Sequence, residues 1–553
     1  MFPETTGAPA ISAPKRFHAV VIGAGHNGLA TALRLARAGW RVAVVERRDT
    51  VGGCATTEEL WPGFRISTAA YVLSLFPRWL IEEFRLRQFG LEVLPREPSS
   101  ITPLPDGRVL LLGHDPACNQ QQLAQFSPHD AQQLPRYEAL LEQVARVLEP
   151  LLEQVAPDPL PLPPSWRRRG WGKRLRDLGT LHALWRGLGE LGPLVPQAVR
   201  LLAGAALPFL QRFFHSEVLL ATLATDAVIG SCTPPDAPGS AYVLLHHMMG
   251  TAGGARGRWG YVRGGMGGLS QALARAAQAR GVQVLLESPA RRILVERGRC
   301  CGVELADGTV LAAPVVASSL DPNWTFLRLL EEDLLPGEFR QAVQAIDYRS
   351  ASAKINLALS HLPRLEALAR LKHPPPPAGT IHLCPDVEYL HRAYEGCPRG
   401  QMSREPVLEI TIPSVVDDSL APRNAHVMNI FVQYAPYQLA GDWTPEAKEE
   451  LWRRCLEVLN QYFPDFEQAV LHRQVLSPAD LEQTFGLTGG NIFQGAMTPE
   501  QLFCLRPVPG WADHRTPVPG LYLCGAAAHP GGGVLGLCGY NAAGQILRDW
   551  PSL

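Results

Sequence analysis

The chain carries almost no net charge, because its 51 lysine and arginine residues nearly cancel its 52 aspartate and glutamate residues. Such a balance gives no overall attraction for the phosphate backbone of nucleic acid, so nucleic acid is not an expected partner. With 553 residues, of which 46% are hydrophobic, the chain is long enough for two or three domain-sized cores. The composition therefore predicts a globular protein.

The sequence also lacks a hydrophobic run that is long enough to cross a membrane. Its longest apolar stretch, residues 203–210, lies between Arg200 and Arg212 and falls well short of the roughly 20 residues that a spanning helix needs. Residues 1–15 lack the apolar core of a secretory signal, so we expect them to form a flexible leader. Eleven cysteines occur without a C-x-x-C pair, which is typical of a reducing compartment and predicts a cytoplasmic protein.

A glycine-rich motif near the N-terminus is the most informative feature that is present. Residues 20–22 resemble a short buried strand, and Gly23, Gly25 and Gly28 then follow in the spacing G-x-G-x-x-G, at the start of an apolar helix. The three glycines permit a tight turn, close approach of a pyrophosphate to the backbone and close packing of the helix on the strand. We expect phosphates at the N-terminus of this helix, where unpaired N–H groups favour negative charge.

An acidic residue completes this motif. Residues 41–45 form a second predicted strand that ends at Glu46, where a carboxylate accepts hydrogen bonds from ribose hydroxyls. An acid at this position disfavours a 2′-phosphate, so the ligand is expected to be of the FAD or NAD type. No second G-x-G-x-x-G follows a predicted strand, which argues against a separate NAD(P)H domain.

Three separated segments predict one sheet domain that is assembled discontinuously, from residues 16–104, 260–335 and 506–553. Each segment combines short apolar strands with a glycine-rich turn or a helix, and Asp307-Gly308 is a strong hairpin signal in the second. The two intervening regions, 105–259 and 336–505, are predicted to form a substrate domain. The first of them has a largely helical pattern, and the second mixes strands with helices.

Four stretches of sequence resemble the FAD-dependent oxidoreductases of the phytoene desaturase and monoamine oxidase superfamily, and particularly its phytoene-dehydrogenase-related branch. The stretches are residues 20–64, 259–277, 489–503 and 519–543. The resemblance covers nearly the whole chain. It implies an α/β fold with a discontinuous FAD-binding Rossmann-like domain of the glutathione-reductase type and an inserted α+β substrate domain.

The resemblance further implies that FAD is the cofactor, and it assigns residues to parts of that molecule. The pyrophosphate would be surrounded by Gly23, Gly25, His26, Asn27 and Gly28, and the ribose would be bound by Glu46. An adjoining loop against the cofactor would contain Arg47, Arg48, Gly52 and Gly53, and adenine would be contacted by Ala290. The pyrophosphate, ribityl chain and flavin ring would be approached by Gly525, Gly532, Gly533 and Val534. Cys54 stands where monoamine oxidase relatives have arginine, which removes one expected phosphate contact. No second cysteine lies near Cys54, so disulfide reductase chemistry is not expected.

Two residues are candidates for chemistry beside the flavin. Alternation in the predicted strand 353–359 places Lys354 on the same face as Ser352 and Asn356, where it would hold a water molecule if that face lines the cavity. A solvated strand face is the commoner explanation of such a pattern and the interpretation that we favour. His529, in a glycine-rich turn, is either an acid or hydrogen-bond donor near the flavin or a residue that stabilises the turn through the backbone.

The function predicted from these features is dehydrogenation of a small lipophilic or amine-bearing molecule by hydride transfer to FAD. Electrons would then pass to oxygen, a quinone or another acceptor. The alternative is a flavin-binding scaffold or regulatory protein without robust turnover. No spacing of metal ligands is present, so no metal is expected. Six basic residues and two tryptophans in residues 166–176 suit an anionic membrane surface, which leaves peripheral membrane contact as a further possibility beside a solvated helix.

Overall fold

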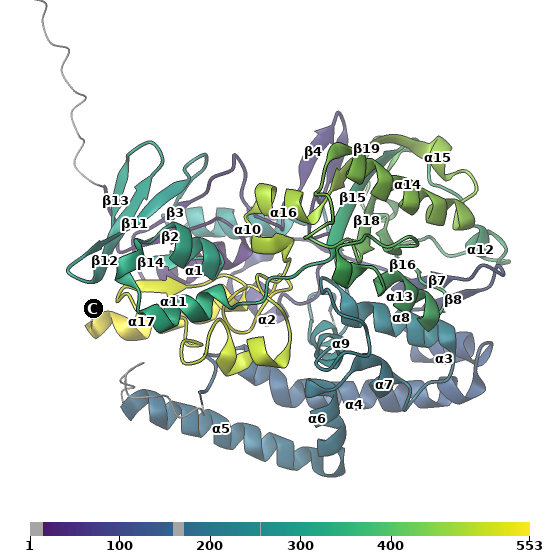
Figure 1. The fold of residues 1–553 in the computed structure, drawn as a ribbon, viewed down its shortest axis with the longest axis horizontal. Helices are drawn as coiled ribbons and strands as arrows, with labels where there is room; N and C mark the ends of the chain where they lie inside the picture. Colours follow the sequence, from purple (N-terminus) through teal and green to yellow (C-terminus); the bar gives the residue numbers. More distant parts are fainter. Residues whose placement is uncertain (1–14, 159–170, 255, 553) are drawn as a thin grey trace, which may run out of the picture.

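The computed structural model describes residues 15–158, 171–254 and 256–552. The predicted leader, residues 1–15, therefore lies almost entirely outside the described residues. Lys15 belongs to a two-residue strand, β1 (Lys15–Arg16), which pairs with β13. Figure 1 shows the described chain as two sheet-containing halves with a group of helices below them.

A parallel five-stranded sheet is the centre of one half. Its strands come from all three segments that the sequence predicted, in the order β10 (Gln283–Leu285), β3 (Val42–Val45), β2 (Ala19–Ile22), β14 (Val315–Ser318) and β20 (Leu521–Leu523). Three helices share one apolar cluster with this sheet: α1 (His26–Arg37), α10 (Gly267–Gln278) and α17 (Leu537–Asp549). The predicted fold class is confirmed, since this sheet with its covering helices is a Rossmann-like unit built from distant segments.

Three smaller sheets accompany the parallel one. A four-stranded sheet has the order β1, β13 (Val310–Ala312), β12 (Arg299–Leu305) and β11 (Ala290–Glu296), and the turn between β12 and β13 contains the predicted Asp307-Gly308 hairpin. Two ribbons pair β4 (Glu58–Trp61) with β5 (Phe64–Ile66), and β6 (Val93–Pro95) with β9 (Gly260–Val262). α2 (Arg78–Glu83) follows the first ribbon along the chain.

A seven-stranded mixed sheet is the centre of the other half. Its order is β19 (Val470–Leu476), β15 (Ser352–Leu359), β18 (His426–Gln433), β17 (Val407–Thr411), β16 (Thr380–Leu383), β7 (Ser100–Pro103) and β8 (Val109–Leu112). One face packs its apolar side chains against α14 (Pro445–Tyr462). Although β7 precedes the predicted domain boundary at residue 104, it pairs within this sheet, so the division into domains stays a prediction.

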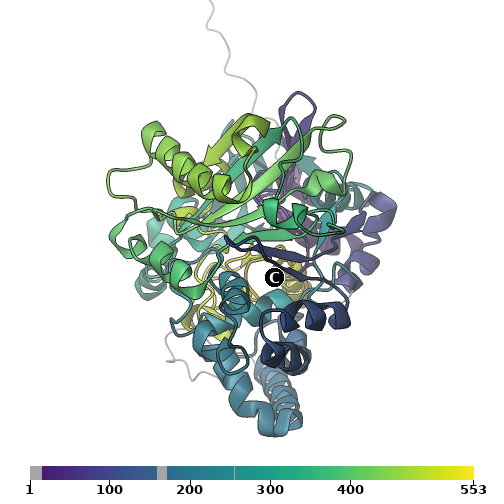
Figure 2. The same ribbon diagram turned by 90° about the vertical axis from the view of Figure 1, so that its right-hand side faces the viewer.

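The remaining helices accompany both halves, since Phe339 and Val343 of residues 337–344 pack in one apolar cluster with the parallel sheet. Six of them flank or connect strands: α11 (Gly337–Gln344), α12 (Glu366–Ala369), α13 (Val387–Tyr394), α15 (Phe466–Ala469), α16 (Pro478–Phe485) and, before them in the chain, α3 (Pro116–Ala124). In the second view, α14 lies on the opposite side of the seven-stranded sheet from the helical group (Figure 2). The sheet is therefore covered on both faces, as strands buried from end to end require.

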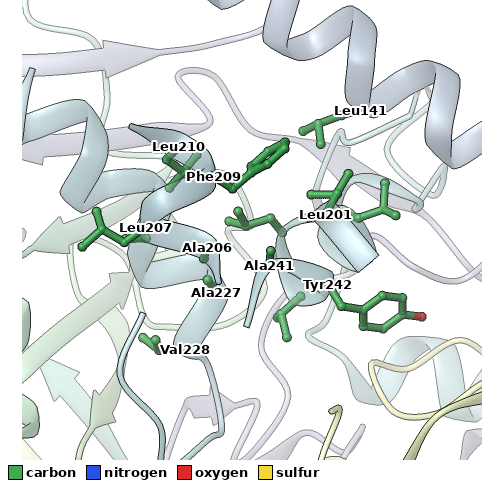
Figure 3. Close-up of a cluster of buried hydrophobic side chains, with 14 of the residues drawn as sticks. Leu141, Leu201, Ala206, Leu207, Phe209, Leu210, Ala227, Val228, Ala241 and Tyr242 are labelled. Carbon is green, nitrogen blue, oxygen red and sulfur yellow. The ribbon is translucent and has the colours of Figure 1, made fainter. Parts of the chain in front are cut away.

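The helical group fills the predicted helical region. Its members are α4 (Pro128–Leu152), α5 (Trp171–Leu191), α6 (Val195–Ala203), α7 (Ala206–Leu210), α8 (Glu217–Val228) and α9 (Ala241–Met248). Figure 3 shows side chains from five of them converging, among them Leu141, Leu201, Phe209 and Tyr242. This core fixes α8 and α9 beside the seven-stranded sheet. In the part of the chain that is described, no helix combines the length and apolar character that crossing a membrane requires.

Candidate cofactor and substrate cavity

A cavity of about 490 Å³ runs from the carboxyl ends of the parallel strands to the seven-stranded sheet. Ile22 ends β2, Val45 ends β3, and Ser319 follows β14; all three line the cavity. In open parallel sheets this edge is the usual place for a bound ligand. The sequence-predicted residues that line the cavity are Gly23, Gly25, His26, Asn27, Glu46, Arg47, Arg48, Gly52, Gly53, Ala290, Lys354, Gly533 and Val534.

The N-terminus of α1 forms one wall of the cavity. Gly25 is its N-cap, and among the described residues no side chain caps the first turn. Gly25 also forms a bridge with Gly52, and a Cβ atom built on Gly25 has nothing nearer than the Gly52 carbonyl oxygen at 3.9 Å. The backbone N–H groups of α1 thus face open space, which suits a pyrophosphate.

Glu46 is held rigidly at the end of β3. Its Oε2 accepts a hydrogen bond from the Ala24 N–H at 2.8 Å, and its Oε1 accepts one from the Arg48 N–H at 3.0 Å. The residue is only 7% exposed and lines the cavity. The second lone pairs of both oxygens remain for ribose hydroxyls, in agreement with the predicted role.

Arg47 and Arg48 lie beside this carboxylate, but each already has protein partners. Arg47 donates to the carbonyl groups of Gln483 and Thr484, and Arg48 forms an ion pair of 2.5 Å with Glu58. Cys54 also lines the cavity, and burial raises the pKa of its thiol to about 12, so it stays protonated at neutral pH. Besides the backbone N–H groups, Nη1 of Arg48 is left as a phosphate donor at this place, since it is buried without a hydrogen-bond partner in the described chain.

The C-terminal glycine loop approaches the cavity through Gly533 and Val534. Val534 has φ 59°, a left-handed conformation that is strained for a β-branched residue and that is concentrated at functional sites. His246 of α9 supports the loop, because its Nε2 lies 2.9 Å from the carbonyl oxygen of Gly532. Helix α9 thereby fixes the position of the loop relative to the substrate end of the cavity.

Four predicted site residues lie away from the cavity. Gly28, Gly525 and Gly532 are packing positions, because a Cβ atom on each would lie 2.6 Å or less from Gly23, Ser319 and Phe493 respectively. His529 is also buried elsewhere, and its Nε2 lies 2.7 Å from the carbonyl oxygen of Leu151 at the end of α4. Its interpretation as a residue bonded to the backbone holds, and the one as a catalytic acid is wrong.

Lys354 lines the cavity from β15 and is only 2% exposed. The favoured interpretation of a solvated strand face is therefore wrong, because both faces of the seven-stranded sheet are covered. The Nζ atom lies 3.6 Å from the centre of the Tyr71 ring and has no hydrogen-bond partner within the described chain. Burial lowers the pKa of Lys354 well below its ordinary value, which favours the neutral amine.

Aromatic and apolar side chains around Lys354 were not predicted from the sequence. They include Tyr71, Val72, Ile229, Trp259, Phe431 and Phe493, together with His247. They come from distant segments without a shared motif, so only the tertiary fold brings them together. Their character suits a substrate whose reacting part is apolar.

A different cluster on α4 and the segment before α8 contains metal-ligand types. Donor atoms of His129, Asp130 and His215 lie within 4.8 Å of one another. Both oxygens of Asp130 already accept hydrogen bonds from the backbone N–H groups of His215 and Ser216, which explains its complete burial without an ion. The absence of a metal thus stays a prediction.

The residues of the cavity fit FAD. The bare N-terminus of α1, the glycine wall at Gly25 and Gly52, and the fixed carboxylate of Glu46 supply what a pyrophosphate and a ribose need. The apolar part beyond them continues to the seven-stranded sheet, where a substrate can meet the cofactor.

Comparison with known proteins agrees with this geometry. The sequence model of a family described as "Flavin containing amine oxidoreductase" matches residues 28–547. The chain is 44% identical to pyridine nucleotide-disulfide oxidoreductase domain-containing protein 2 of Mus musculus, over 97% of this chain and 94% of that protein. It is 28% identical to hydroxyneurosporene desaturase of Cereibacter sphaeroides, over 96% of this chain and 98% of that one.

Solved structures show the same fold. Cyclohexylamine oxidase from Brevibacterium oxydans superposes with a TM-score of 0.57 at 18% identity, over 97% of this chain and 99% of that one. Putrescine oxidase bound to putrescine superposes with a TM-score of 0.58 at 17% identity, over 98% of this chain and all of that one. The resemblance identified from the sequence and the expectation of FAD as cofactor are confirmed.

Proposed function

Because this chain belongs to the flavin containing amine oxidoreductase family, we propose that it dehydrogenates a small, lipophilic or amine-bearing molecule. The chain is an FAD-dependent oxidoreductase of the oxidase and desaturase type. One observation carries the finer proposal. One cavity is lined by the cofactor residues Gly25 and Glu46 and also by the apolar side chains beside Lys354.

When bound, FAD supplies the chemistry of hydride acceptance. The chain has the complementary tasks of binding the substrate, orienting it and excluding water. Tyr71, Trp259 and Phe431 supply apolar contact area beside Lys354. Because its pKa is lowered, the Lys354 amine is available as a neutral hydrogen-bonding group that can hold a water molecule at Nζ.

The activities for which relatives are named set the range of substrates to test. One relative is named as a desaturase of hydroxyneurosporene, and two structural neighbours are oxidases of putrescine and cyclohexylamine. The apolar walls favour a lipophilic reacting group, while the family includes amine oxidases. Polyenes and amines are accordingly the two classes to compare first.

The first experiment is a visible absorption spectrum of the purified protein, with identification of whatever is released by heat. We expect FAD at about one per chain, followed by bleaching under anaerobic conditions with one of the two substrate classes. A colourless protein that does not take up added FAD would contradict the cofactor assignment. A flavoprotein that no polyene or amine reduces would contradict the substrate proposal and favour the scaffold alternative.

We also propose that α5 meets a membrane surface. Leu175, Leu178 and Trp185 are 67%, 63% and 71% exposed and share one helix face, flanked by exposed Arg176 and Arg186. Apolar and basic side chains on one helix are typical of interfacial binding. Of the basic run that suggested this contact, residues 166–170 lie outside the described chain.

A further inference from the structure

A row of four side chains crosses the seven-stranded sheet at the far end of the cavity. Lys354 lies opposite Phe431, Phe431 opposite Glu409, and Glu409 opposite His382, on four adjacent antiparallel strands. Directly opposed residues share a face of the sheet. Lys354 and Phe431 line the cavity, and Glu409 and His382 continue the same face of the sheet beyond the lining residues.

Helices α8 and α9 cover this extension and add a second carboxyl group. Thr225 Oγ1 lies 3.2 Å from His382 Nδ1, and Asp226 follows it on α8. The Asp226 carboxylate lies 4.0 Å from Nδ1 of His247, which lines the cavity. The Asp226 side chain is 40% exposed although its neighbours Thr225 and Ala227 are each only 1% exposed, so we place it at an internal water-accessible space.

The surroundings leave the two carboxyl groups with little positive charge. Burial lowers the pKa of His247 and of His382 to about 3, so both rings are neutral at neutral pH. Glu409 is 3.8 Å from His382 and 4% exposed. Burial raises the pKa of both carboxyl groups, and the charge of Asp226 raises that of Glu409 further. The charge of one acid thus disfavours ionisation of the other, so we expect the pair to hold about one proton near neutral pH.

Other titratable groups face the pair from every neighbouring element. Arg96, which is 3% exposed, supplies the fixed positive charge and opposes the rise in both carboxyl pKa values. Lys354 would act on Glu409 in the same direction only in its charged form, which burial disfavours, and the phenols of Tyr71, Tyr137 and Tyr261 have raised pKa values and stay neutral. One shared proton and Arg96 together leave the site without net charge.

Two polar atoms without a hydrogen-bond partner lie at this end of the cavity and indicate a ligand there. Nζ of Lys354 and Nδ1 of His247 are buried and line the cavity, and neither has a hydrogen-bond partner within the described chain. Buried polar atoms are normally satisfied by protein, water or ligand. Their position between the apolar walls and the carboxyl pair is where the polar part of a substrate would lie.

We propose that Asp226 and Glu409 form a subsite for a hydrogen-bond-donating end of the substrate, an alcohol or a protonated amine, remote from Lys354. The inference rests on the proposed function, since it assigns a substrate class to the same cavity. Two strand spacings separate Lys354 from Glu409, so this end lies about 10 Å from the lysine strand. A substrate with an apolar reacting part and a polar end at that distance fits both regions.

The carboxyl pair accommodates either donor but not an anion. A hydroxyl group donates to the ionised carboxylate and accepts from the protonated one, without any change of charge. An ammonium group displaces the shared proton, and the two carboxylates then balance it and Arg96. A carboxylate would add negative charge beside two enclosed acids, and such a contact between like charges is unfavourable.

The test uses the FAD-loaded protein and three probes of equal length: 1-octanol, n-octylamine and octanoate. Binding is followed by the change in flavin absorbance, which needs no turnover. We expect octanol or octylamine to bind at least about tenfold more tightly than octanoate, and Asp226→Asn or Glu409→Gln to remove that preference. Glu388→Gln, at an exposed acid of α13, is the matched control and should change nothing.

The pH dependence separates the two donors. Below the pKa of the pair, octylamine affinity should rise about tenfold per pH unit, because one proton is released on binding, whereas octanol affinity should stay constant. An octylamine affinity that rises with pH and an octanol affinity that is independent of pH each support the subsite. Equal or tighter binding of octanoate, or a preference that both variants retain, would overturn it. Flavin content measured in the same samples reports separately on the cofactor assignment, so the two failures are distinguishable.

Discussion

Gly25 and Gly28 stand three residues apart in α1, yet an added side chain would meet different surroundings at each. At Gly25, a Cβ atom would enter open cavity, with the nearest atom 3.9 Å away. At Gly28, it would lie 2.1 Å from the Gly23 carbonyl oxygen. The first glycine leaves room for a ligand, and the second allows the helix to pack on the turn.

This contrast gives a prediction for a pair of variants. Gly25→Val should reduce bound FAD to less than about a tenth of the wild-type amount while the protein stays folded, because the valine occupies the ligand's space. Gly28→Ala should lower the free energy of unfolding by about 1–3 kcal/mol, because the turn must move. Flavin absorbance and chemical denaturation check the two effects, and a Gly25→Val protein with stoichiometric FAD would show that the site is misplaced.

Lys354→Met should stabilise the folded protein near neutral pH. In the unfolded chain the lysine is protonated below its ordinary pKa, whereas burial lowers its pKa in the folded protein. Below the ordinary pKa, folding therefore requires the lysine to release a proton, which is unfavourable. We expect the variant to gain on the order of 1–3 kcal/mol at pH 7, with a gain that shrinks as the pH approaches 10. Denaturant unfolding at several pH values measures this.

A functional effect should accompany the gain in stability. If the lysine holds a water molecule in the cavity, Lys354→Met should also slow reduction or reoxidation of the flavin. Lys372→Met, at an exposed lysine, is the control for both measurements. A change in the free energy of unfolding that does not vary with pH would contradict the lowered pKa and would show that Lys354 acts only through packing.

At the scale of elements, the sequence predicted the strands better than it predicted the helices and side chains that pack against them. The predicted strand 353–359 agrees with β15 to within a residue at each end. Alternation identified the faces of β15, but it could not show that helices cover the polar one. The pairing register that sets Glu409 beside Phe431, and α8 that adds Asp226, depend on contacts between distant segments and leave no local signal.

Helix α5 carries a prediction of its own. Replacing Leu175, Leu178 and Trp185 together by serine should weaken binding to vesicles that contain anionic lipid, because insertion depends on apolar area. Co-sedimentation measures the bound fraction. Stability should change by no more than about 0.5 kcal/mol per position, since the three side chains are exposed.

The control for this helix lies on another exposed surface. Leu471→Ser removes a half-exposed leucine of β19 and should leave vesicle binding unchanged. Equal sedimentation of the α5 variant and the wild type would contradict membrane contact. A change of oligomeric state in the variant would show that the face meets a second copy instead.

At the scale of the whole molecule, the cofactor residues join segments that are far apart in the chain. Gly25, Glu46, Ala290, Phe485 and Val534 all line one cavity. FAD should therefore stabilise the fold by linkage, by about 2.7 kcal/mol when its free concentration is a hundredfold above Kd. Thermal unfolding of the protein stripped of flavin, with and without added FAD, tests this, and NAD in place of FAD is the control.

The discontinuous arrangement was predictable, because each segment carries its own strand and glycine signal. It was harder to predict from the sequence which strands belong to the seven-stranded sheet. β7 lies at the end of the predicted N-terminal segment and β8 just after it, yet both strands complete the far edge of the sheet that contains β15. Short strands of this kind look alike in sequence, and only the parallel pairing of β7 with β16 assigns them.

Strand β20 lies beside β14 although 202 residues separate the end of one from the start of the other. During synthesis on the ribosome, residues 521–523 are made long after β14, so that edge of β14 stays open while the residues between the two strands are added. An open strand edge invites pairing with other chains. Nascent copies of this chain are consequently exposed to aggregation during that interval, and the complete cofactor cavity forms only after Gly533 and Val534 have been made.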